Sequence, residues 1–217
     1  MLKLYFAPGS CSFVPLVALE TIKASTGEDF QTQIVKLHKA ENRTPEYLDL
    51  NPDGQVPMLI VDGKPLTQVI AICDFLNRRH PELGLMPADP SAQSEALSLL
   101  AWMNNTVHPT FTHVFLPHKF TDNEAAKAEL KRYNLDQYRG LLKRIESLVA
   151  KTDPYLFGNK MSVVDIYAAL FLRWGGLVGI NPADYPAYKS FVDRIGTSPA
   201  VAAALERERM PLHTFKG

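Results

Sequence analysis

The sequence has few cysteines, no long apolar run and no excess of charge of either sign. Its 217 residues include two cysteines, Cys11 and Cys73, whose wide separation argues against a disulfide framework. With no apolar run approaching ~18 residues and no basic segment leading into a signal-like apolar core, we expect a cytosolic protein without a membrane span. Lysine plus arginine equal aspartate plus glutamate, at 23 each, so nucleic acid and anionic lipid are not expected partners.

Common cofactor and metal motifs are also missing from the sequence. It contains no G-x-G-x-x-G, no P-loop, no H-E-x-x-H and no paired C-x-x-C. His108, His113 and His118 are five residues apart. On one helix they would step by about 140° and would not share a face as metal ligands do. We therefore expect no metal site.

The first 80 residues alternate strand and helix signals. The expected elements are a strand at Leu2 to Phe6, a helix from Phe13 to about Ala24, a strand at Phe30 to Val35, a strand at Pro57 to Val61, and a helix from about Gln68 to Arg79. A short helix precedes the third strand, and the Asp62-Gly63 turn predicts a hairpin. This order predicts a small mixed sheet with helices on its faces, because parallel strands need a covering crossover.

Beyond a segment rich in proline, the chain has helical periodicity throughout. Residues 81–90 read as a linker between a first domain of residues 1–80 and a second of residues 91–217. The expected helices are Ser91 to about Leu116, Asn123 to Ala150, Ser162 to about Trp174, Pro186 to about Arg194, and a short one near Ala200. Ser162 and Asp165 have the spacing of a capping box. The fold class is therefore α/β followed by an all-α domain.

Cys11 is the residue with the clearest chemical potential. It follows a Pro-Gly turn between the first predicted strand and the first predicted helix. A helix N-terminus favours an anion, so a thiol there can ionise near neutral pH. Many cysteines are instead small buried hydrophobic residues. Gly9, Ser10 and Ser12 favour a loop edge here, whereas Cys73, within an apolar helical segment, is interpreted as core. A sulfur partner for Cys11 is expected from outside the chain.

A second pattern lies directly before the third strand. In Gln55-Val56-Pro57, an X-Pro bond that opens a strand is a usual place for a cis peptide. The backbone N–H and C=O of Val56 would then face a ligand. The other parts of the pattern are Pro8-Gly9-Ser10-Cys11-Ser12, Leu66-Thr67-Gln68, Ala71-Ile72, His108-Pro109 and Ser162 to Asp165. Over nearly its full length the chain resembles the cytosolic glutathione transferases, and within them the bacterial beta class.

The resemblance implies a thioredoxin-like first domain, a helical second domain that forms an apolar cleft for the second substrate, and a homodimer. It also implies glutathione as co-substrate and a small hydrophobic electrophile, disulfide or peroxide as the other substrate. By the resemblance, Cys11 forms a mixed disulfide with glutathione, and Val56 beside cis Pro57 pairs with its cysteinyl part. Lys36 and Gln55 match positions near its glycine end, and His108 matches a histidine of the cleft with acid–base potential.

The chain departs from the family at the start of the helix after the hairpin. An acidic residue or glutamine followed by Ser or Thr usually holds the γ-glutamyl end there, but this chain has Gln68 followed by Val69. Gln68 and the helix N-terminus can still accept that group. The missing hydroxyl predicts a glutathione affinity lower by roughly one to two orders of magnitude.

Three interpretations of the activity follow. Cys11 reduces disulfides or peroxides with glutathione, which the poor donor strength of a thiol favours. Alternatively Cys11, Ser10 or Ser12, with the local helix dipole, stabilises the glutathione thiolate for conjugation to electrophiles, and other classes use a serine near this position. Tyr5 is interpreted as packing within its strand. The third is a non-catalytic ligand carrier or interaction protein on the same scaffold, with weak glutathione binding because of Val69.

Overall fold

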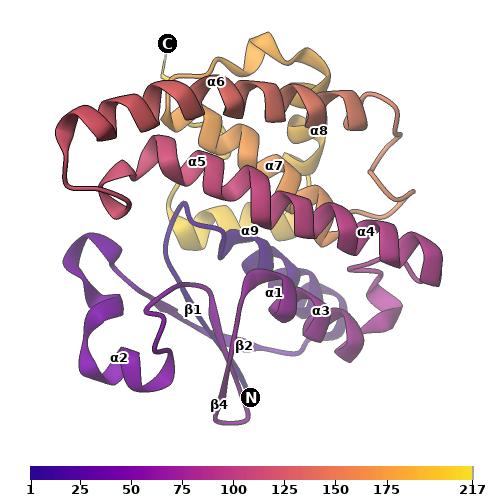
Figure 1. The fold of residues 1–217 in the computed structure, drawn as a ribbon. Helices are drawn as coiled ribbons and strands as arrows, with labels where there is room; N and C mark the ends of the chain where they lie inside the picture. The colour runs from indigo at the N-terminus through magenta and orange to yellow at the C-terminus, as the bar shows by residue number, and fades with distance from the viewer. Residues whose placement is uncertain (217) are drawn as a thin grey trace. The chain divides into compact units, whose positions relative to one another are not determined.

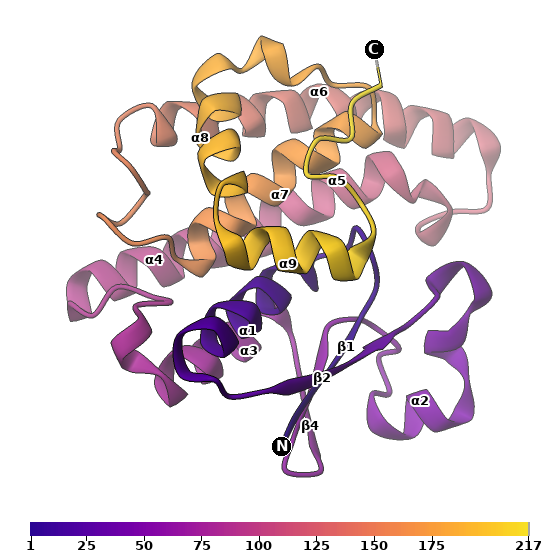
Figure 2. The ribbon, with the colours of Figure 1, turned by 180° about the vertical axis from the view of Figure 1, so that it is seen from behind.

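The computed structural model describes residues 1–216, which form two compact units (Figures 1 and 2). The first unit holds Met1–Ala88 together with Gly196–Pro211, and the second holds Asp89–Ile195 together with residues 212–216. The expected fold class, an N-terminal mixed sheet followed by helices, is confirmed. The domain limits at residues 80 and 91 stay a prediction. Among the described residues, no helix is both long and apolar enough to cross a bilayer.

The first unit contains the sheet. Its elements in chain order are β1 (Leu2–Phe6), α1 (Phe13–Thr26), β2 (Phe30–Ile34), the 3-10 turns η1 (Leu37–Lys39) and η2 (Glu41–Arg43), α2 (Pro45–Leu50), β3 (Met58–Val61), β4 (Lys64–Thr67), α3 (Val69–Arg79), η3 (Pro81–Leu83) and α9 (Pro199–Glu208). The strand and helix order expected for the first 80 residues is confirmed. Gln68 lies just outside α3, at its N-cap.

The four strands lie in the order β2-β1-β3-β4. β2 is parallel to β1, while β3 is antiparallel to β1 and β4 is antiparallel to β3. Every second residue of β1 is buried, because side chains alternate between the two faces of a strand. Figure 1 shows α2 on one side of the sheet and α1 and α3 on the other, and Figure 2 agrees.

The α2 side of the sheet has a small apolar core of its own. Val35, Tyr47 and Met58 form its centre, with Tyr5 and Ile60 packed against them. Tyr5 and Tyr47 meet edge to face, with ring centroids 5.9 Å apart. Tyr5 therefore packs as the sequence predicted.

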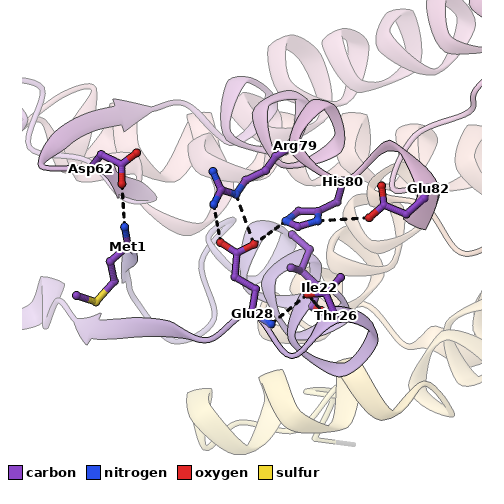
Figure 3. A network of polar contacts seen from close by, with 8 residues as sticks. All are labelled: Met1, Ile22, Thr26, Glu28, Asp62, Arg79, His80 and Glu82. Atoms are coloured by element: carbon purple, nitrogen blue, oxygen red, sulfur yellow. Dashed lines mark hydrogen bonds and ion pairs between the residues drawn. The ribbon is translucent and has the colours of Figure 1, made fainter.

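Polar contacts tie the end of α3 to the turn that joins α1 and β2 (Figure 3). Glu28, in that turn, accepts from Arg79 Nη2 at 2.8 Å, and His80 Nε2 lies 2.8 Å from its other carboxylate oxygen. His80 Nδ1 lies 3.4 Å from Glu82. The network therefore links the α1–β2 turn to the segment after α3, which is about fifty residues away in the chain.

The second unit consists of helices. They are α4 (Pro90–Trp102), the π-helical segment η4 (Met103–Val107), α5 (His108–Phe115), the 3-10 turn η5 (Pro117–Lys119), α6 (Glu124–Val149), α7 (Val163–Leu177), the 3-10 turn η6 (Pro182–Asp184) and α8 (Pro186–Gly196). The capping box at the start of α7 is confirmed, since Asp165 accepts from both the amide and the hydroxyl of Ser162.

One helix expectation needs correction. The sequence predicted a single helix from Ser91 to about Leu116, but a π-helical segment, η4, interrupts it at Met103–Val107. A one-residue change in hydrogen-bond register leaves almost no trace in apolar periodicity, and π segments commonly occur at functional positions. In this chain the segment ends directly before His108.

Candidate functional site

The strand register brings the expected glutathione residues of the first unit to one end of the sheet. Tyr5 pairs with Met58, and Met58 pairs with Thr67, so the end of β1, the start of β3 and the end of β4 coincide. Phe6 pairs with Ile34, which places the end of β2 there as well. The residues that follow or precede these strand ends are Lys36, Cys11, Val56, Pro57, Gln68 and Val69. Positions up to 58 residues apart therefore gather at one edge.

Cys11 lies in the loop from β1 to α1, two residues before the helix begins. Its side chain is 9% exposed, and its Sγ donates to the Val56 carbonyl oxygen at 3.6 Å. The thiol and the backbone next to Pro57 are thus neighbours, although 45 residues separate them in the chain. Cys73 is 2% exposed, and burial raises the pKa of its thiol far above the ordinary value. Its predicted core role agrees with this environment.

The Val56–Pro57 peptide bond is cis, as the family resemblance implied. Gln55, the residue before this dipeptide, is anchored by its backbone. Its carbonyl oxygen accepts from Tyr47 Oη of α2 at 2.6 Å and from Asn51 Nδ2, just after α2, at 2.7 Å. The Gln55 side chain itself is exposed. Sequence reasoning missed the anchoring roles of Tyr47 and Asn51, which carry no local motif.

The two serines beside Cys11 are held by each other and by the backbone of Ala7. Ser10 Oγ lies 2.8 Å from the Ala7 carbonyl oxygen and 2.5 Å from Ser12 Oγ. Ser12 Oγ also accepts from the Ala7 amide at 3.1 Å and lies 3.2 Å from the same carbonyl. Each hydroxyl has one proton, so both protons are used within this network. Ser12 is fully buried, an environment that favours a structural role over direct contact with a substrate.

Gln68 and Val69 mark the start of α3. Gln68 has φ 72° and ψ 122°, a conformation rare for a residue with a side chain and typical of functional positions. Its side chain is exposed, whereas Val69 is 4% exposed. The first amides of a helix lack partners within that helix, so this edge can receive a carboxylate. Lys36, just after β2, is exposed, and its Nζ lies 3.9 Å from Glu41 Oε1.

His108, the remaining predicted site residue, belongs to the second unit. Burial, with Lys119 adding to it, lowers the pKa of His108 to about 4, so the ring is neutral at pH 7. Its Nδ1 lies 3.0 Å from Tyr167 Oη, which in turn lies 3.2 Å from Asn104 Oδ1. Which of the two groups, the His108 ring or the Tyr167 hydroxyl, donates across the first contact depends on the tautomer of the neutral ring. The sequence did not point to Tyr167 or Asn104.

Among the residues that the structure describes, no group of His, Cys, Asp and Glu side chains could hold a metal ion. The roles assigned to the candidate residues stay predictions. What the geometry provides in the first unit is a sheet edge with a cis-proline backbone, a helix N-terminus and the Cys11 thiol, which lies in the expected loop but is buried.

Two family models match the chain. The model of the glutathione S-transferase N-terminal domain covers residues 1–78, and that of the C-terminal domain covers residues 89–199. A curated relative, glutathione S-transferase GST-4.5 of Xanthomonas campestris pv. campestris, is 29% identical over 209 residues, which are 95% of this chain and 98% of the relative. A maleylacetoacetate isomerase of Pseudomonas aeruginosa is 28% identical over 185 residues, which are 83% of this chain and 86% of the isomerase.

Solved structures give the same picture. A sphingomonad glutathione S-transferase complexed with glutathione is 34% identical, with a TM-score of 0.81 over 96% of this chain and 100% of that chain. A bacterial beta class glutathione S-transferase from Sphingomonas chungbukensis is 29% identical, with a TM-score of 0.82 over 96% of this chain and 100% of that chain.

Proposed function

From the premise that the chain belongs to the glutathione S-transferase family, we propose that it is a glutathione-dependent enzyme whose reactive group is the Cys11 thiol. Family membership, expected from the sequence, is confirmed. The co-substrate is glutathione, bound at the sheet edge with its cysteinyl backbone on Val56 and its γ-glutamyl end at Gln68 and Val69. The structurally similar sphingomonad glutathione S-transferase, which was solved in complex with glutathione, supports this choice of ligand.

One observation carries the proposal: the Cys11 Sγ lies 3.6 Å from the carbonyl oxygen of Val56. A tripeptide that pairs with the Val56 backbone would bring its own sulfur close to Cys11. Two sulfur atoms held side by side are suited to thiol–disulfide exchange.

The chemistry we propose is reduction of disulfides by glutathione. The Cys11 thiolate attacks the glutathione sulfur of a mixed disulfide R–S–S–G, forms the Cys11–glutathione disulfide and releases RS⁻. The thiolate of a second glutathione then attacks the glutathione sulfur of that intermediate. This step regenerates the Cys11 thiolate and releases oxidised glutathione.

Conjugation is the weaker candidate for this site. Activation of glutathione by a serine requires a hydroxyl proton directed at the bound sulfur. The protons of Ser10 and Ser12 are used within their network with Ala7. Disulfide or peroxide reduction is therefore proposed as the main activity, with slow conjugation of small hydrophobic electrophiles.

As the resemblance implies, we propose a homodimer, which sedimentation velocity tests.

Replacement of Cys11 tests the reaction. In Cys11→Ala, we expect reduction of a mixed disulfide by glutathione to fall by about two orders of magnitude or more, because the covalent step is lost. Intact-mass spectrometry of the wild type after treatment with oxidised glutathione should show one added glutathione, mapped to Cys11.

Two controls separate the alternatives. Cys73→Ala should keep the activity, because Cys73 is a buried core residue. Disulfide reduction that survives in Cys11→Ala would contradict the proposal. Conjugation that survives there while disulfide reduction is lost would assign conjugation to a serine. A protein that is not retained on immobilised glutathione and turns over no disulfide, peroxide or electrophile would instead be a carrier.

A further inference from the structure

The C-terminal end of α9 holds the loop that carries Cys11. The Gly9 amide donates to Glu208 Oε1 at 3.1 Å, across 199 residues of sequence. On Gly9, a β carbon would lie 3.1 Å from Met210 Sδ and 3.2 Å from its Cε. Gly9 also has φ +74°, which favours glycine. The Glu208 carboxylate thus holds the Gly9 amide, and Met210 lies close to where a side chain at position 9 would begin.

Glu208 is well placed for this contact. Its side chain is 2% exposed, and a carboxyl group at such depth is costly unless it is hydrogen-bonded. The helix that presents it packs along α1. The pair of Arg207 with the buried Glu20 of α1 fastens the same turn of α9. Arg209 then adopts a left-handed conformation, φ 53°, which ends α9 and leads to Met210.

The other anchors of the loop are local or come from the sheet. Ser10 and Ser12 bind Ala7, and Cys11 Sγ contacts the Val56 carbonyl. Glu208 is an anchor from the opposite end of the chain, and its bond is made two residues before the thiol. A loop amide that loses its acceptor forms a hydrogen bond with water instead, and the segment around it then opens locally.

We propose that Glu208 is a positioning residue, which accepts from the Gly9 amide and thereby keeps the Cys11 thiol against Val56. The consequence for turnover rests on the proposed function. The consequence for thiol exposure does not, because it concerns the free protein.

Native-state alkylation tests this without glutathione. Wild type and variants react with iodoacetamide, and mass spectrometry of peptides follows Cys11 and Cys73 separately. Glu208→Met keeps the length of the side chain and removes the acceptor. We expect the Cys11 alkylation rate to rise about fivefold, the factor for a hydrogen bond worth about 1 kcal/mol, while the Cys73 rate stays unchanged. Glu208→Gln keeps an acceptor oxygen and should restore the wild-type rate.

The matched control is Glu206→Met, which makes the same substitution at an exposed glutamate of the same turn of α9 and leaves both Glu208 and the Arg207–Glu20 pair in place. Its Cys11 rate should match the wild type. Equal acceleration of Cys11 and Cys73 in Glu208→Met would indicate general loosening and overturn the proposal. An unchanged Cys11 rate, or no rescue by Glu208→Gln, would also overturn it.

A second measurement needs no variant. Hydrogen exchange of the wild-type protein should show the Gly9 amide protected, since it donates to a buried acceptor. Exchange of this amide at the rate of an unstructured peptide would overturn the proposal. Failure of the Cys11→Ala assay would refute the proposed reaction and leave these two results standing.

Discussion

Val69 is the residue at which the sequence resemblance predicts a departure from the glutathione transferases. Val69 lies at the start of α3, where the resemblance implies a hydroxyl that holds the γ-glutamyl end of glutathione. Because its side chain is 4% exposed, a replacement must fit the same space. Thr has nearly the shape of Val and supplies the hydroxyl.

We therefore expect Val69→Thr, and Val69→Ser as the smaller alternative, to tighten glutathione binding about tenfold. One added hydrogen bond to a carboxylate is worth about 1–3 kcal/mol. Calorimetric titration with glutathione measures the change. Val69→Ala, which lacks the hydroxyl, should show no gain, and equal affinity in all four proteins would mean that the hydroxyl is irrelevant.

His108 makes the stability of the protein sensitive to acid. Because its pKa is lowered to about 4 in the folded state, the unfolded chain, at about 6.5, takes up the proton first. The stability due to the neutral ring is thus complete above about pH 6.5 and is lost as the pH falls towards 4.

In His108→Gln this loss should disappear. Between pH 7 and pH 4.5 the wild type should lose about 2–3 kcal/mol more unfolding free energy than the variant, as the pKa difference requires. Urea unfolding at the two pH values, followed by tryptophan fluorescence, measures both. Parallel losses in the two proteins would contradict a His108 ring that is neutral in the folded state.

At the scale of the elements, the polar network of Figure 3 joins the α1–β2 turn to the end of α3. The hydrogen bond from Arg79, followed by the charge of Arg79 and the contact with His80, lowers the pKa of Glu28, against the effect of burial. A lowered carboxyl pKa contributes stability above the ordinary value of about 4.5 and loses it as the pH falls below.

Glu28→Gln should therefore cost about 1 kcal/mol of unfolding free energy at pH 7 and almost nothing at pH 3. Chemical denaturation at both pH values tests this. Glu82→Gln is the matched control, because the Glu82 side chain is 61% exposed and its contact with His80 is longer, at 3.4 Å. An equal effect of both variants would show that the network does not stabilise this joint.

The elements also show how far sequence patterns reach. Alternation in β1, the Asp62-Gly63 turn and the capping box of α7 are local, so they predicted the strand, the hairpin and the helix start. The π-helical segment before His108 was not predicted, since the residues in it have no distinctive pattern. Likewise, nothing local predicts φ 72° at Gln68, which is set by the junction of β4 and α3.

At the scale of the whole molecule, the balance of positive and negative side chains governs how solubility depends on pH. With 23 positive and 23 negative side chains, electrostatic repulsion between copies is weakest near pH 7. Solubility in a polyethylene glycol precipitation series should therefore pass through a minimum near pH 7. The exposed Lys131 offers a test, because Lys131→Glu changes the charge by two units and should move the minimum to lower pH. A minimum that stays in place would mean that apolar contacts govern association.

The sequence by itself determined the order of strands and helices, the family, the position of the Cys11 thiol before a helix, and the cis bond expected at Pro57. These features depend on local periodicity and on short motifs. The tertiary structure decided which distant groups meet: Cys11 with Val56, His108 with Tyr167, and Gly9 with Glu208. The physical reason is that strand register and helix packing set such contacts, and both are sums over many weak interactions that no single segment contains.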